Sequence, residues 1–180
     1  MSKYEVTQAQ WEEVMGNNPS RFQSGDDFPV ECVSWNDCQV FLEKLNLLPA
    51  VRSSGVVFRL PTEQEWEYAC RAEAAGPYCR LVDGTEITDA SLGRVAWFAD
   101  NSDAMTHPVG QKEPNAFGLY DMHGNVWEWT QMAEGESRVI RGGAWNLPAW
   151  YCESAFRNRC SPSGRGFSLG FRLCASGRAG

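Results

Sequence analysis

Cysteine carries the most reactive side chain in this chain and occurs seven times, at positions 32, 38, 70, 79, 152, 160 and 174. A thiolate can bind a soft metal, form a disulfide or act as a nucleophile. These positions lack the paired short spacings of a zinc site and are too sparse for a disulfide scaffold. The odd count requires at least one free thiol or an intermolecular bond. Cys38 and Cys70 fall at apolar positions of predicted helices, which favours buried, inert thiols there.

A tryptophan-rich motif from Asn115 to Trp129 is the densest motif of the chain. Within it, Glu128 alternates with Trp127 and Trp129. This alternation predicts a strand that buries two indoles on one face and directs the carboxylate to the other. His123 stands alone in the motif, so we expect it to be a surface or loop histidine rather than a metal ligand.

The apolar residues of segment 146–168 follow neither a period of 2 nor a period of 3.6. Trp150, Tyr151, Phe156 and Phe167 stand there among small polar residues and arginines, a composition typical of recognition loops. An ordinary long surface loop has the same composition, so both interpretations stay open. The candidate ligand-binding residues are Asn146, Leu147, Ala149, Trp150, Tyr151, Glu153, Phe156, Asn158, Arg159, Ser161, Ser163, Arg165, Phe167 and Ser168.

The borders of this segment are typical of structural elements. Gly142 and Gly143 precede Trp145, which favours a strand entry where two main chains come close. The run from Gly170 to Leu173 predicts a short terminal strand. We expect Trp145, like Trp127 and Trp129, to belong to the core.

Capped helices are predicted to position these features. N-cap residues and capping boxes predict helices over 8–15 after Thr7, from Ser34 to about Leu47, and after Thr62, where Glu65 completes the box. Strands are predicted at Val30 to Val33 and Val56 to Leu60. The middle, 73–111, is rich in glycine and polar residues and is predicted to be mostly loop.

The length of 180 residues fits one domain, 1–180. The net charge of −7 argues against nucleic-acid binding, which needs a basic face. No apolar run approaches the roughly 18 residues of a membrane span. The chain opens with residues that already predict a strand entering a helix, and it shows no signal peptide. We therefore expect further sequence before Met1.

Several motifs, in order, resemble the formylglycine-generating enzyme (sulfatase-modifying factor) domain family over nearly the whole chain. They are Tyr4-Glu5-Val6-Thr7, Arg59-Leu60-Pro61-Thr62-Glu63, Gly124-Asn125-Val126-Trp127-Glu128-Trp129, Arg141-Gly142-Gly143 and Gly170-Phe171-Arg172. The resemblance implies an α+β, C-type-lectin-like fold with much irregular structure. It also implies a structural calcium ion held by the side chains of Asp121 and Glu128 and the main-chain carbonyls of Gly124 and Val126, an all-oxygen set. The alternative is that Glu128 pairs with a neighbouring arginine.

The enzymes of this family use two cysteines five residues apart to hold copper and oxidise a sulfatase cysteine. Cys152 matches the first, but Arg157 stands at the second position, and Cys160 lies three residues further on. Arginine cannot bind Cu(I). The resemblance therefore breaks at the residue that carries the chemistry, and we expect no copper.

Another branch of the family serves as variable proteins of diversity-generating retroelements, whose 3′ gene end is rewritten. Family-typical borders around a mixed interior fit that branch, with 141–174 as the variable, ligand-binding segment; drift in a non-catalytic paralogue would look the same. By analogy we expect a monomer at the cell surface or outside the cell that binds a protein or cell-surface ligand. The alternative is a copper-dependent formylglycine-generating oxidase.

Overall fold

The computed structural model describes residues 1–177. Along these residues the elements are α1 (Gln8–Met15), α2 (Trp35–Leu47), α3 (Pro49–Ser53), β1 (Val56–Arg59), α4 (Glu63–Arg71), the 3₁₀ helix η1 (Asp89–Arg94), β2 (Ala96–Trp97), β3 (His123–Gly124), β4 (Trp127–Glu134), β5 (Ser137–Arg141), the 3₁₀ helix η2 (Ala149–Cys152), β6 (Arg157–Cys160), β7 (Leu169–Gly170) and β8 (Cys174–Gly177). None of these helices combines the length and the apolar character needed to cross a membrane.

The three predicted N-caps begin the three predicted helices. Thr7 accepts a hydrogen bond from the Gln10 amide, and the Gln10 side chain accepts one from the Thr7 amide, which satisfies two N–H groups at the start of α1. Ser34 and Thr62 form the same reciprocal arrangement at α2 and α4. The local chemistry of the chain therefore decides where these helices begin.

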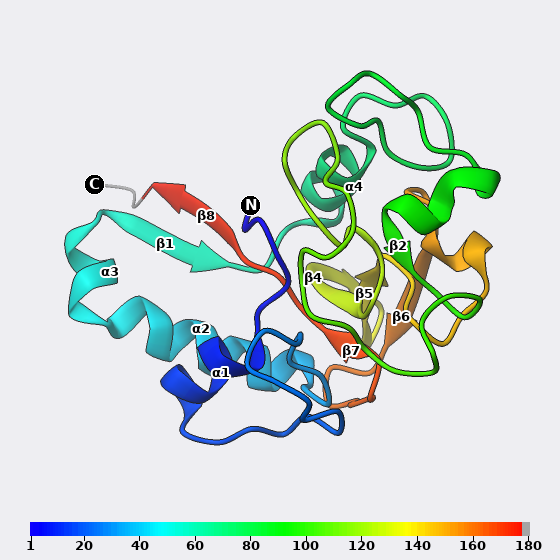
Figure 1. Ribbon diagram of the computed structural model, residues 1–180. Helices are drawn as coiled ribbons and strands as arrows, with labels where there is room; N and C mark the ends of the chain where they lie inside the picture. The colour runs from blue at the N-terminus through cyan, green and yellow to red at the C-terminus, as the bar shows by residue number, and fades with distance from the viewer. Residues whose placement is uncertain (178–180) are drawn as a thin grey trace.

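A four-stranded sheet in the order β6-β5-β4-β7 forms the centre of the fold (Figure 1). β4, β5 and β6 are antiparallel neighbours, and β7 joins β4 in parallel. β1 and β8 form a separate antiparallel arm beside α2 and α3, at the left in Figure 1. Residues 73–111 are mostly irregular apart from η1 and β2, as the sequence predicts.

The main core lies between this sheet and the first two helices. Trp11 of α1 stacks on Phe41 of α2 with ring centroids 5.3 Å apart, and Phe171 packs edge-on against both rings. Trp129 is fully buried in the same cluster. Trp127 and Trp145 are buried too, which confirms the three predicted core tryptophans.

Two predicted strands differ from the observed structure. The segment from Val30 to Val33 is largely buried but forms no strand, because Cys32 has a φ of 61°, which interrupts the extended backbone. The preceding Pro29 forms a single bridge with Thr7, and the Val30 amide donates a hydrogen bond to the Val6 carbonyl. The apolar residues of the segment fill the core without a neighbouring strand. The predicted terminal strand is divided, because β7 pairs with β4 whereas β8 pairs with β1, and Phe171 and Arg172 lie between them.

Candidate functional site

The predicted ligand-binding residues all lie at the surface of the molecule. The exposed ones are Asn146, Trp150, Asn158, Arg159, Ser161, Ser163, Arg165 and Phe167. The half-buried ones are Leu147, Ala149, Tyr151, Glu153, Phe156 and Ser168. By contrast, residues 141–145 and 169–172 on either side are buried. We call residues 146–168 the C-terminal face.

Contacts from the rest of the fold hold the C-terminal face mainly through its main chain. The buried Arg141 guanidinium donates to the carbonyl oxygens of Ser154 and Ala155, both at 2.8 Å, and of Phe156. Gly143 comes so close that a Cβ on it would lie 2.9 Å from the Tyr151 carbonyl oxygen. Neither of these contacts involves a side chain of the face, although others do, since Arg165 pairs with Asp37 at 2.8 Å and Phe156 packs against Trp127. Much of the path of the face is therefore held by its main-chain atoms.

Further hydrogen bonds also hold the face through its main-chain atoms. Each joins a main-chain atom of the face to a group elsewhere in the fold: Ala99 N to Leu147 O, His123 Nδ1 to Cys152 O, Ser154 N to Pro77 O, Asn36 N to Pro162 O, Cys32 N to Gly166 O, Trp145 Nε1 to Phe167 O and Trp127 N to Ser168 O, over 2.7 to 3.3 Å. Main-chain carbonyls and amides are present whatever residue occupies a position.

The aromatic residues of the face form one cluster and one separate contact. Trp150 stacks on Tyr151 with centroids 3.7 Å apart, and Phe156 contacts both rings and the core residue Trp127. Trp150 is 50% exposed, whereas Tyr151 and Phe156 are half-buried against the main core. Of the four aromatic candidates, Trp150 and Phe167 are therefore exposed, whereas Tyr151 and Phe156 contribute to packing on the core.

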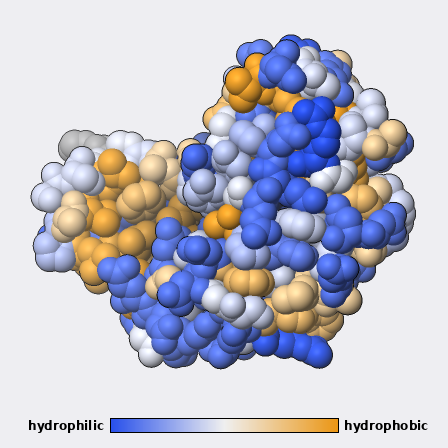
Figure 2. All heavy atoms as spheres, viewed as in Figure 1, coloured by the Kyte–Doolittle hydropathy of each residue, from blue (hydrophilic) through white to orange (hydrophobic). Residues whose placement is uncertain are grey.

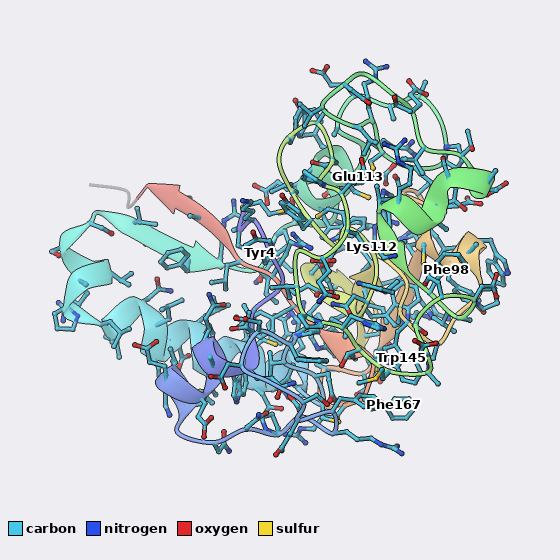
Figure 3. The ribbon with its side chains drawn as sticks, in the orientation of Figure 1. Tyr4, Phe98, Lys112, Glu113, Trp145 and Phe167 are labelled. Carbon is cyan, nitrogen blue, oxygen red and sulfur yellow. The ribbon has the colours of Figure 1, made fainter. Side chains whose placement is uncertain are left out.

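Phe167 extends the face toward the N-terminal part of the chain. It lies against Trp145 (Figure 3), and the Arg21 guanidinium lies 5.1 Å from the centre of its ring. Phe22, next to Arg21, packs edge-on against Trp145. Arg21 and Phe22 thus border the face, and nothing in the local sequence of that loop indicates this contact.

The thiols near the positions that the resemblance implies for copper lie in environments that disfavour the thiolate. Cys152 is fully buried, and burial raises the pKa of its thiol to about 12. Arg157, five residues after Cys152, lies on β6 and pairs with Glu63 at 2.9 Å. Cys160 is half-buried, and burial raises its pKa as well. Thiolates are the form that binds copper, and burial disfavours that form at both cysteines.

Glu128, one of the predicted calcium ligands, already has partners for both carboxylate oxygens. Its Oε1 and Oε2 accept hydrogen bonds from Arg172 at 2.7 Å and 2.7 Å, and Oε2 also accepts one from Trp66 Nε1. Both side chains of the Glu128–Arg172 pair are fully buried. The arginine already supplies the positive charge that a cation would bring, so the alternative interpretation of Glu128 holds.

The other side chain of the set, Asp121, keeps one free oxygen. Its Oδ2 accepts from the Gly110 amide at 2.7 Å, and its Oδ1 has no partner among residues 1–177. Burial raises the pKa of Asp121 to about 6. Gly124 and Val126 are buried beside it in the chain. Calcium takes six to eight oxygen ligands, and of the two predicted side-chain ligands only Asp121 keeps an oxygen without a partner among the described residues.

His123 is not the surface or loop histidine that the sequence suggests. It lies fully buried on β3, where Nδ1 donates to the Cys152 carbonyl at 2.7 Å and Nε2 accepts from the Cys79 amide at 3.2 Å. Burial lowers its pKa to about 4, so the ring is neutral at pH 7. The ring thus positions the main chain of the C-terminal face at Cys152.

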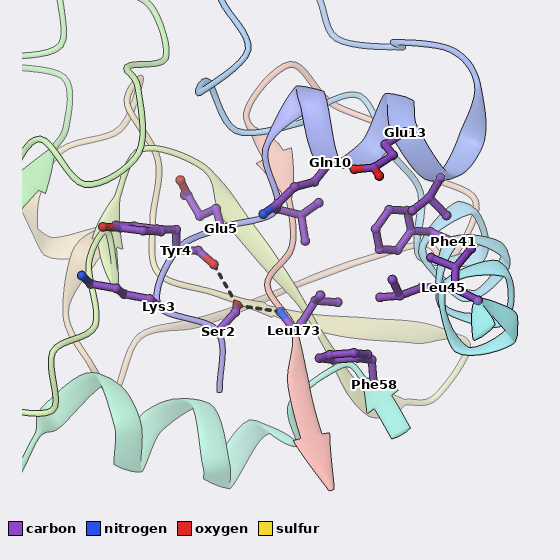
Figure 4. Close-up of a pocket in the computed structure, with 13 residues that line it drawn as sticks. Ser2, Lys3, Tyr4, Glu5, Gln10, Glu13, Phe41, Leu45, Phe58 and Leu173 are labelled. Carbon is purple, nitrogen blue, oxygen red and sulfur yellow. Dashed lines mark hydrogen bonds between the residues drawn. The ribbon is translucent and has the colours of Figure 1, made fainter. Parts of the chain in front are cut away.

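None of the predicted site residues lines a cavity of about 400 Å³ elsewhere in the fold. It opens between α1, α2, β1 and the first residues of the chain, with Val14, Phe41, Leu45 and Phe58 on its walls (Figure 4). It borders the hydrophobic surface over the β1 arm in Figure 2. The C-terminal face and this cavity are separate features.

Comparison with known proteins adds to this geometry. The family "Sulfatase-modifying factor enzyme 1-like domain" matches residues 1–176. The formylglycine-generating enzyme of Streptomyces coelicolor is 35% identical over 178 residues, which cover 82% of this chain and 52% of that protein. The inactive C-alpha-formylglycine-generating enzyme 2 of Bos taurus is 33% identical over 189 residues, which cover 96% of this chain and 58% of that protein. The chain therefore spans little more than half the length of these two relatives.

Among solved structures, Treponema denticola variable protein 1 matches with a TM-score of 0.84 and 31% identity. The match covers 97% of this chain and 82% of that one. These similarities confirm both the resemblance seen in the sequence motifs and the α+β, C-type-lectin-like fold that it implies.

Proposed function

Because the chain belongs to the sulfatase-modifying factor enzyme 1-like family, we propose that it is a non-catalytic protein that binds a ligand through a diversified surface within its C-terminal segment, residues 141–174. The observation that carries this proposal is the way the C-terminal face is held. Much of its path depends on hydrogen bonds to main-chain atoms, whereas its candidate ligand-binding side chains are exposed or half-buried. A surface built in this way can change its residues without unfolding.

Two further observations support a binding function over a catalytic one. The second catalytic thiol position holds Arg157, and Cys152 is buried with a raised pKa. The relatives include a protein named as an inactive enzyme and a variable protein. The alternative, a copper-dependent oxidase acting on a sulfatase cysteine, would need a pair of thiolates, and burial disfavours the thiolate at Cys152 and at Cys160.

The proposed partner is a protein or another cell-surface ligand. Exposed aromatic rings and arginines are the residues that contribute most at protein interfaces, and Trp150, Phe167 and Arg159 are of this kind. By analogy with a variable protein, the proposed location is the cell surface or the outside of the cell, and the proposed state is a monomer. No nucleic-acid partner is proposed, because the net charge is −7.

The first experiment randomises the candidate residues and asks whether the fold survives. We expect most variants in a library with diversified exposed positions of 146–168 to stay folded, as measured by protease resistance on a display platform. Lysozyme then serves as a probe protein, and we expect selection to yield variants that bind it. A matched library that randomises buried positions of 141–145 should lose the fold. If the two libraries unfolded equally often, the surface could not tolerate diversification and the proposal would fail.

The second experiment reads the neighbouring DNA. A diversified protein requires a reverse transcriptase gene and a near-copy of the 3′ end of this gene. We expect differences between the copy and the gene to fall at adenines within the codons of residues 146–168. A neighbouring sulfatase gene without these elements would favour the enzymatic alternative.

A further inference from the structure

β6 is an edge strand that runs along the C-terminal face. It pairs with β5 in the register Arg157 to Arg141 and Cys160 to Arg138, and within residues 1–177 no other strand pairs with it. Asn158 and Arg159 of this strand are candidate ligand-binding residues, and both are exposed. An unpaired strand edge can accept a further strand from another chain.

The hydrogen bonds show which main-chain groups point away from the sheet. The Arg159 amide donates to Oδ1 of Asn158 at 2.8 Å and so has a partner outside the ladder with β5. In an antiparallel pair the outward groups recur at every second residue. The main-chain N–H and C=O groups of Arg157 and Arg159 therefore face outward from the sheet. The side-chain oxygen of Asn158 accepts a hydrogen bond from one of them, the Arg159 N–H.

The side chains at this edge are basic. A recess of about 220 Å³ lies there, lined by Glu134, Arg157, Asn158 and Arg159. The Arg157 side chain is 47% exposed and forms ion pairs with Glu63 and Glu134. Arg159 is exposed and forms no ion pair among the described residues. Residues two apart on a strand point to the same side, so both arginines can meet acidic side chains of one extended partner.

We propose that the partner of the C-terminal face supplies an extended segment with acidic side chains, which adds to β6 as a further antiparallel or parallel strand. This proposal rests on the proposed binding function. Main-chain hydrogen bonds give affinity that does not depend on the residues of β6, and the side chains beside them give specificity. A surface whose residues change would thus keep one constant docking element. In the free protein the side chain of Asn158 occupies the Arg159 N–H, and a main-chain carbonyl of the partner would take its place.

The test uses a synthetic peptide of alternating threonine and glutamate as a probe, with NMR of the protein amides as the readout. We expect chemical shift changes at Arg157 to Cys160. Arg159→Pro removes the outward N–H without removing a ladder bond, and edge strands tolerate proline. This variant should lose about tenfold in affinity, the effect of about 1.4 kcal/mol.

The matched control is Arg159→Ala, which keeps the N–H and removes the charge. It should lose only about two- to fivefold, the effect of an exposed ion pair. A peptide methylated on alternate amide nitrogens tests the same bonds on the unaltered protein. One methylation register should abolish binding and the other should leave it intact, and this result does not require the proline variant to fold.

Each other outcome would overturn the inference. Shift changes confined to Trp150 and Phe167, and equal in both variants, would leave the proposed binding function in place without strand addition. Binding that both methylated peptides retain would exclude main-chain pairing. No shift at any residue of the face would exclude this edge as a site for acidic strands, and the library experiment would then decide the binding function separately. Dimerisation of the protein without peptide would identify a second copy as the occupant of the edge.

Discussion

Arg172 and Glu128 form an ion pair in which neither side chain reaches solvent, with nitrogen and oxygen atoms 2.7 Å apart. Arg172 also donates to the Tyr120 carbonyl, and Trp66 donates to Glu128. The pair joins the chain after β7 to the middle of the sheet. It also takes the place in which the family resemblance suggests a calcium ion.

Removing one partner of this pair should destabilise the fold strongly. We expect Arg172→Met to lower the free energy of unfolding by about 3–5 kcal/mol, because Glu128 would remain buried without a counter-charge. The double variant Arg172→Met with Glu128→Gln should recover part of that loss. Arg94→Met is the control, because the Arg94–Glu113 pair is exposed, and it should cost at most about 1 kcal/mol. The free energy of unfolding is measured in urea. Equal losses for Arg172→Met and Arg94→Met would contradict the buried, paired state of Arg172.

Calcium removal should leave the melting temperature unchanged. Both oxygens of Glu128 are already bonded to Arg172, so a cation has no free carboxylate there. The measurement is a thermal melt in excess EDTA and in excess calcium. A bound ion would add about 2.7 kcal/mol at a hundredfold excess over its Kd. A calcium-dependent rise that Asp121→Asn removes would restore the calcium site.

The aromatic residues of the C-terminal face should separate into two groups. Trp150→Ser and Phe167→Ser should each change stability by no more than about 0.5 kcal/mol, because these rings are 50% and 38% exposed and lie outside the main core. Tyr151→Ser and Phe156→Ser should each cost more than about 1 kcal/mol, since these rings pack on the core. Trp129→Ala is the core reference and should cost about 3–5 kcal/mol. Equal losses at 150 and 156 in denaturant unfolding would refute this division.

Formylglycine formation should be absent. The prediction follows from the proposed non-catalytic function, in which Arg157 stands where the resemblance implies a second thiol, and from the burial of the Cys152 thiol. The assay incubates the protein with Cu(I), oxygen and a peptide that contains Cys-X-Pro-X-Arg, and follows the peptide mass. An aldehyde product above the protein-free control would contradict the prediction. Loss of that product in Cys160→Ala would then show that Cys160 had taken the second position.

Acidification should weaken the fold through His123. Its pKa is about 4 in the folded state, below the ordinary value of 6.5, so the unfolded chain binds more protons between these values. Stability is therefore fully present above pH 6.5 and falls as the pH drops toward 4. The loss should reach on the order of 3 kcal/mol. The measurement is the free energy of unfolding in urea at several pH values between 4 and 6.5. In His123→Gln this free energy should depend less steeply on pH than in the parent protein, and an equally steep dependence would assign the effect to other groups.

The sequence by itself determined the features that depend on near neighbours. Thr7, Ser34 and Thr62 begin helices because the side chain of each accepts a hydrogen bond from the main-chain N–H three residues later. No distant contact is needed for that. The alternation around Glu128 likewise predicted a strand with two indoles on the opposite face. The borders and surface exposure of residues 146–168 followed from the family motifs and the mixed composition.

Only the tertiary structure decided which distant groups meet. Arg172 is 44 residues from Glu128, and nothing in the pattern around Glu128 distinguishes an arginine partner from a metal ion. The burial of His123, the half-burial of Tyr151 and Phe156, and the contact of Arg21 with Phe167 have the same origin. In each case the environment of a side chain is made by segments far away in the chain. Local periodicity describes a residue's own element, whereas burial and pairing depend on what packs against it.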